Sequence, residues 1–171
     1  MTASRTIAAA AIVASAACFG AAAQAAQPLE RQPVLSLAAA RAIADGCIAK
    51  AVERGWKMNV AVVDGGANPL LFERMDGAAL GSIEHAQLKA VQSAEMGAST
   101  RSFAELAWGK DNRGGELPGL AMLPGFVTFA GGLPIRAGDA LVGGVGVSGS
   151  LPDHDEACAQ AGLDAAKDLL R

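Results

Sequence analysis

Residues 57–75 read Lys-Met-Asn-Val-Ala-Val-Val-Asp-Gly-Gly-Ala-Asn-Pro-Leu-Leu-Phe-Glu-Arg-Met, and the fold class follows from this stretch. The largely apolar runs over 57–63 and 69–75 predict two strands, and the turn formers at 64–68 join them as a hairpin. Strands joined by so short a turn run antiparallel. The first two strands of the predicted sheet are therefore antiparallel.

The rest of the chain supplies helices and a strand meander around this hairpin. Ser36 is a plausible N-cap and Gly55 a stop for a first helix, and Pro152 opens the last one. Helical spacing predicts helices over 37–54, 80–96, 100–108 and 152–170. Three further strands are expected near 126–130, 132–137 and 139–147, after a long Gly- and Pro-rich loop over 109–125. The sum is an α+β domain with a five-stranded antiparallel sheet and helices packed on it.

The N-terminal 25 residues have the form of a signal peptide. Arg5 precedes an apolar stretch, and Ala23-Gln24-Ala25 has the small-x-small form that a signal peptidase recognises. We therefore expect a signal peptide over 1–25, a single domain over 26–171, a periplasmic or secreted location, and no membrane segment after cleavage. Cys18 is then lost on cleavage.

Composition and cysteine usage exclude some classes of protein. The net charge is −3 and the chain has no basic run, which argues against nucleic acid binding. The mature chain has two cysteines, Cys47 and Cys158, and two histidines without zinc-type spacing, which argues against structural zinc. Both cysteines fall on apolar helix faces. An oxidising compartment permits a disulfide, but we favour two buried free thiols because sequence cannot supply the Cα separation.

The stretch 144–149 literally matches the dinucleotide fingerprint GxGxxG, but its context does not fit. The fingerprint needs a βαβ unit and an acidic residue at the end of a following strand, and no strand follows here. We interpret these glycines as places where a helix or a ligand approaches the backbone of a strand.

The helix over 80–96 carries two opposed rows. Ile83, Ala86, Ala90 and Ala94 recur at helical spacing and should face the sheet, while a second row lies about 200° around the helix at 100° per residue. That second row consists of His85, Lys89, Gln92 and Met96. It is either a solvated outer face, a ligand wall or a subunit interface. Histidine and methionine both ligate haem iron, and a lysine can pair with a propionate.

The other notable polar residues can be interpreted as structural or as functional. Arg74 with Asp76 either binds a ligand or forms the commoner turn-stabilising ion pair. His154 lies between Asp153 and Asp155, and we expect an N-terminal capping cluster there. No nucleophile–base–acid set is visible, so no catalytic residue is predicted.

Six motifs in order, over roughly residues 35–170, resemble the GlcG/HbpS-like haem-binding family, which is related to the C-terminal domain of PduO-type proteins. They are 61–66 (Ala-Val-Val-Asp-Gly-Gly), 72–78 (Phe-Glu-Arg-Met-Asp-Gly-Ala), Lys89-Ala90, 131–135 (Gly-Gly-Leu-Pro-Ile), 144–149 (Gly-Val-Gly-Val-Ser-Gly) and Asp155-Glu156. The resemblance implies a profilin-like fold with a five-stranded antiparallel sheet between helices on both faces. It also implies oligomers, and haem or tetrapyrrole binding for some members.

The leading hypothesis is an exported, homo-oligomeric binding protein for haem or a related tetrapyrrole, without turnover of its own. His85 is the expected metal ligand, and Arg74, Lys89, Gln92 and Met96 are the other expected ligand-binding residues. Two alternatives stay open. One is an enzyme or accessory protein of small organic acid catabolism, with Arg74 on the carboxylate and the loop over 109–125 as a lid. The other is a structural oligomer built through the His85 face.

Overall fold

The computed structural model describes residues 31–171, of which 32–171 form one compact unit. The expected signal peptide and Cys18 lie outside the described residues. None of the helices in the described part is long and apolar enough to cross a membrane.

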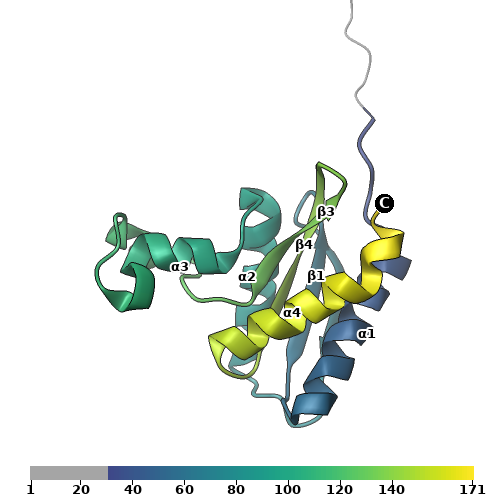
Figure 1. Ribbon diagram of the computed structural model, residues 1–171, viewed down its shortest axis with the longest axis horizontal. Coiled ribbons are helices and arrows are strands. Elements are labelled where there is room, and N and C mark those ends of the chain that lie inside the picture. The colour runs from purple at the N-terminus through teal and green to yellow at the C-terminus, as the bar shows by residue number, and fades with distance from the viewer. Residues whose placement is uncertain (1–30) are drawn as a thin grey trace, which may run out of the picture. The chain divides into compact units, whose positions relative to one another are not determined.

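Four α-helices and four strands make up the ordered framework of the described chain (Figure 1). The helices are α1 (Leu37–Arg54), α2 (Ser82–Met96), α3 (Thr100–Trp108) and α4 (Pro152–Ala166). The strands are β1 (Asn59–Asp64), β2 (Pro69–Arg74), β3 (Gly132–Ala137) and β4 (Ala140–Ser148). Short 3-10 turns follow α3 and α4: η1 (Lys110–Asn112), η2 (Pro118–Met122) and η3 (Lys167–Leu169). The Ser36 cap and the Gly55 stop of the first helix are confirmed.

The sheet has the order β2-β1-β4-β3 and every pairing in it is antiparallel. Side chains alternate between its two faces. Val60, Val62, Val145 and Val147 join the main core under α1 and α4, whereas Ala61 and Val63 pack under α2. Figure 1 shows α1 and α4 running side by side over one face, with α2 behind the sheet. The α+β class and helices on both faces are confirmed.

The predicted fifth strand is wrong. Residues 126–130 lie outside the sheet, although they have a strand-like sequence. The Gln92 side chain accepts from the Val127 N–H at 2.6 Å and donates to the Val127 carbonyl at 2.9 Å. The indole N–H of Trp108 donates to the carbonyl of Thr128 at 3.2 Å. Side chains therefore satisfy backbone groups that a neighbouring strand would otherwise pair.

At Gly144 and Gly146, within the stretch 144–149, a helix approaches the sheet, as the sequence predicted. A Cβ on Gly144 would collide with the carbonyl oxygen of Ala90, and a Cβ on Gly146 with that of Ala86. The backbone of α2 therefore lies directly on β4 at Gly144 and Gly146.

The expectation of two free thiols is also wrong, because Cys47 and Cys158 form a disulfide between α1 and α4. Their Cα atoms are 4.5 Å apart. The helices come this close because glycines face each other: a Cβ on Gly46 would lie 2.6 Å from the Cβ of Ala165, and one on Gly162 would collide with Ile43. Small residues at the crossing thus fix the cysteine separation that the spacing could not reveal.

We expect Gly146→Ala to lower the free energy of unfolding by about 1–3 kcal/mol or more, because the added methyl group forces α2 off the sheet. Urea denaturation measures the change. Gly119→Ala is the matched control, since a Cβ there meets nothing within 4 Å. Equal effects of the two substitutions would contradict the close contact between α2 and β4.

Removing the disulfide with Cys47→Ala and Cys158→Ala together should lower the free energy of unfolding by about 2–5 kcal/mol, because it closes a loop of more than a hundred residues. Urea denaturation of the oxidised protein, the reduced protein and the double variant measures this. The reduced protein and the variant should unfold at similar urea concentrations. Coincident curves for the oxidised protein and the variant would count against a stabilising bridge.

Candidate functional site

The row of alanines on α2 lies on the sheet as predicted, with Ala86, Ala90 and Ala94 buried in one cluster. The opposed row is covered by the chain's own segment 124–131, which we call the covering segment. His85 contacts its Phe129 edge-on, with 5.3 Å between the ring centres. Gln92 binds its Val127, and Met96 shares a small hollow with residues 124–126. The row is therefore a contact surface within the chain, and only the residues at its two ends, His85 and Met96, are exposed.

Lys89 is fully buried and ion-paired. Its Nζ donates to the Asp155 carboxylate at 2.8 Å and to the Val147 carbonyl at 2.8 Å, and lies 4.7 Å from the centre of the Phe129 ring. Gly131 permits this geometry, because a Cβ there would lie 2.6 Å from the Nζ. One ammonium thus ties α2, β4, α4 and the covering segment together.

Burial has a larger effect on the pKa values of this pair than the attraction between the two charges. It lowers the pKa of the Lys89 ammonium and raises the pKa of the Asp155 carboxyl, and the attraction between the two groups opposes both shifts. The other carboxylate oxygen of Asp155 accepts the Ser150 N–H at 3.0 Å. Both charges are therefore hydrogen-bonded, which is the condition under which a buried ion pair is tolerated.

Sequence reasoning missed the role of Asp155, which it assigned to the helix terminus. A signal was nevertheless present, because four separate motifs of the sequence meet at this pair. Lys89 belongs to Lys89-Ala90, Val147 to 144–149 and Gly131 to 131–135, and Asp155 begins Asp155-Glu156. Spacing alone could not show that they converge.

The remaining predicted site residues lie apart. His85 and Met96 are exposed at opposite ends of α2, and Arg74 is exposed at the end of β2. Arg74 lines a separate hollow with Lys57 and Asp76, and in the described part of the chain it forms no ion pair with Asp76. The turn-stabilising ion pair is therefore not found. Contact of Arg74, Lys89, Gln92 or Met96 with a ligand stays a prediction.

His154 lies away from these residues. Its ring stacks on Trp56 with 4.4 Å between centres, and its Nδ1 lies 2.9 Å from the Ser150 hydroxyl. Asp153 and Asp155 do lie in the first turn of α4, but no side chain there makes a capping hydrogen bond, so the expected capping cluster is not found.

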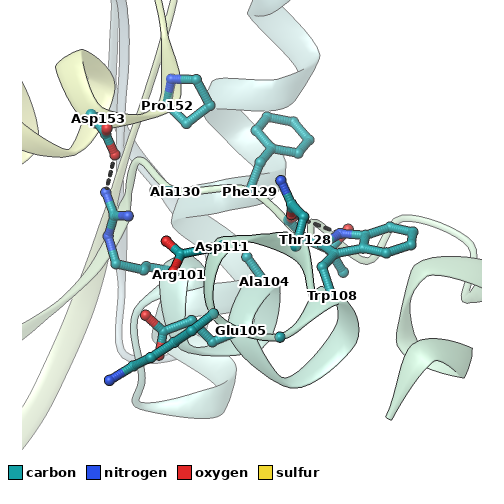
Figure 2. Close-up of a pocket in the computed structure, with 13 residues that line it drawn as sticks. Arg101, Ala104, Glu105, Trp108, Asp111, Thr128, Phe129, Ala130, Pro152 and Asp153 are labelled. Atoms are coloured by element: carbon teal, nitrogen blue, oxygen red, sulfur yellow. Dashed lines mark hydrogen bonds and ion pairs between the residues drawn. The ribbon is translucent and has the colours of Figure 1, made fainter. Parts of the chain in front are cut away.

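A hollow of about 660 Å³ lies between α3, η1 and the start of α4, and Phe129 is part of its lining. Figure 2 shows Trp108 and Phe129 in one half of the view and the Arg101–Asp153 pair in the other. Arg101 bonds Asp153 at 2.6 Å and also pairs with Glu156. The hollow is thus lined by aromatic rings and by charged groups, of which Arg101 is already neutralised.

This hollow does not fit haem well. Its lining includes no histidine, methionine or cysteine to hold iron, and Arg101 is not free for a propionate. His85, which contacts Phe129 but does not line this hollow, does supply a nitrogen donor, because no hydrogen bond within the described residues engages its ring. Across the described chain, no group of three or more His, Cys, Asp or Glu side chains could hold a metal ion.

A four-stranded antiparallel sheet, covered by α2 on one face and by α1 and α4 on the other, defines a small α+β domain of three layers. Residues 35–164 match the family model described as "Haem degrading protein HbpS-like". The chain belongs to this HbpS-like family.

Individual relatives agree with this assignment. An uncharacterised 15.0 kDa protein of Citrobacter freundii is 33% identical over 137 residues, 79% of this chain and 94% of that protein. The structure of a double mutant of Streptomyces reticuli HbpS is similar with a TM-score of 0.70 and 34% identity, covering 91% of this chain and 97% of that one. The haem complex of PduOC has a TM-score of 0.69 at 24% identity, covering 78% and 95%; this likeness concerns the fold alone.

We expect Lys89→Met to lower the free energy of unfolding by about 3–5 kcal/mol, because it leaves the Asp155 carboxylate buried without its partner. The double variant Lys89→Met, Asp155→Leu should lose much less, since no charge remains buried. Urea denaturation of both variants and of Asp155→Leu completes the cycle. Additive losses in the double variant would show that the two side chains act independently.

Proposed function

We propose that this protein binds haem or a related tetrapyrrole, with the imidazole of His85 as the iron ligand. The main support is membership of the HbpS-like family, whose description names haem. PduOC, which shares the fold, has been solved as a haem complex. Haem, when bound, would supply a flat apolar ring and a metal centre; the chain's own residues supply its surroundings.

His85 is the better placed of the two histidines in the described chain. His154 is held by Trp56 and Ser150, whereas the His85 ring is exposed and contacts only the edge of Phe129 among aromatic groups. A neutral imidazole with a free nitrogen is an effective ligand for haem iron. Lys89 and Gln92 act in this proposal as positioning residues, because they hold the covering segment that carries Phe129.

Met96 of the same chain does not share the iron with His85. The two residues are eleven positions apart, which along a helix is about 16 Å at a rise of about 1.5 Å per residue. A second ligand, if the iron has one, comes from elsewhere, and contacts of Met96 and Arg74 with the tetrapyrrole stay predictions.

The His85 surface is open, and this supports assembly. A pocket normally buries about 70–90% of a ligand's surface, which a single exposed helix face does not achieve. We therefore propose that a second copy of the chain covers the ligand, with the half-buried Leu88, one turn along from His85, at the contact. A charged residue at position 88 then weakens both assembly and binding.

Export is part of the same proposal. The disulfide between Cys47 and Cys158 supports it, because such bonds persist in oxidising compartments and are rare in the cytosol. The signal-peptide pattern of residues 1–25 points the same way.

One observation favours a second candidate function, the binding of a small organic acid. Lys57 and Arg74 line one hollow together with Glu73 and Asp76, and none of the four forms an ion pair with another described residue. The ammonium and the guanidinium can bind the carboxylate of an acid, although the two carboxylates of the hollow oppose its charge. A thermal shift with organic acids but not with haemin would favour this function over the first.

Haemin added to the full chain should give a shifted and sharpened Soret band, and His85→Ala should return the spectrum to that of free haemin. The reason is that the iron loses its nitrogen donor. His154→Ala is the matched control and should keep the shifted band. A wild-type spectrum identical to free haemin would refute binding, and a shifted band retained in His85→Ala would refute the assigned ligand. Slow loss of the band under reductant would indicate turnover, which the family description suggests.

A further inference from the structure

We propose that the hollow between α3, η1 and the start of α4 binds a small organic cation with an aromatic ring, independently of haem. Its volume of about 660 Å³ falls in the range of about 300–1,000 Å³ typical of small-molecule pockets. It is lined by the aromatic rings of Trp108 and Phe129, by the ring of Pro152 and by charged groups. Such a lining suits a ligand with a flat apolar ring, and the charged groups of the lining determine which charge the ligand should carry.

The charges in the hollow favour a cation. Arg101 is neutralised by Asp153 and Glu156, and so offers no free positive charge. Among the other lining groups, Glu105 and Asp111 are exposed carboxylates and Lys110 is the one opposing ammonium; none of the three forms an ion pair with another described residue. The carboxylates therefore exceed the available cations.

The helix ends at the hollow also favour a positively charged ligand. The C-terminal turn of α3 reaches the hollow through Glu105 and Trp108, and this end of a helix carries partial negative charge. The opposite pole, at the start of α4, has Asp153 and Asp155 in its first turn, and these carboxylates are paired with Arg101 and Lys89. An ammonium or amidinium group near α3 is thus favoured over a carboxylate.

Trp108 is the ring that a cation can use. The Lys89 ammonium already lies 4.7 Å from the centre of the Phe129 ring, whereas no cation lies over Trp108 within the described chain. The indole is 43% exposed and held in place by its hydrogen bond to the Thr128 carbonyl. Tryptophan is also the side chain with the strongest attraction for cations. A fixed, accessible indole beside two free carboxylates is the core of the proposed site.

Tryptophan fluorescence tests this proposal in the full chain. The chain has two tryptophans, so Trp56→Phe leaves Trp108 as the only reporter. Benzyltrimethylammonium should quench Trp108 saturably, and phenylmethanesulfonate, an anion of similar shape, should bind at least about tenfold more weakly. No saturable quenching by the cation, or equal quenching by both ions, would overturn the proposal.

Substitutions assign the binding to the two carboxylates. Glu105→Gln with Asp111→Asn should weaken binding of benzyltrimethylammonium by about threefold to tenfold, while Asp139→Asn, in the β3–β4 turn, should leave it unchanged. His85→Ala should also leave it unchanged, which separates this site from the haem proposal. All these residues are exposed, and circular dichroism checks that each variant is folded. Undiminished binding in the double variant would overturn the assignment, as would equal weakening by Asp139→Asn.

Discussion

The backbone contact between α2 and β4 is the constraint on which both the fold and the site depend. Gly144 and Gly146 have no Cβ, so the carbonyl oxygens of Ala90 and Ala86 lie against the sheet. Lys89 lies between these two alanines in the sequence and is as deeply buried as they are. Only from that depth does its Nζ reach the Val147 carbonyl and the Asp155 carboxylate. A larger residue in β4 would lift α2 and pull the ammonium away from both.

Much of the framework was predictable because its signals are local. The hairpin followed from turn formers between two apolar runs, and the helix starts and stops followed from Ser36, Gly55 and Pro152. The predicted strand over 126–130 failed for a physical reason. Its local pattern is extended and apolar, but whether an extended segment joins a sheet depends on what pairs its backbone. Here the pairing group is the side-chain amide of Gln92, 35 residues earlier.

The difference between local signals and long-range pairings also explains which parts of the site were predictable. Helical periodicity placed His85, Lys89, Gln92 and Met96 on one face of α2 without showing what covers that face. The cover comes from residues about 30 to 45 positions further on, and the partner of Lys89 lies 66 residues away. The two cysteines are separated by 111 residues, and their meeting depends on glycines that let α1 and α4 approach. Pairings at such separations have no periodic signature in one sequence.

The buried ion pair joins four segments at a cost in desolvation free energy, so its presence calls for an explanation other than stability. Apolar side chains of similar size often stabilise a core as well as or better than a buried pair does. Contacts between apolar side chains, however, are not directional. The Lys89 ammonium must satisfy a carboxylate, a backbone carbonyl and the Phe129 ring at once, which fixes the covering segment relative to α4. Phe129 contacts His85 and also forms part of the lining of the aromatic hollow. The position of one ring thus sets the geometry of both proposed binding surfaces, and the ion pair sets the position of that ring.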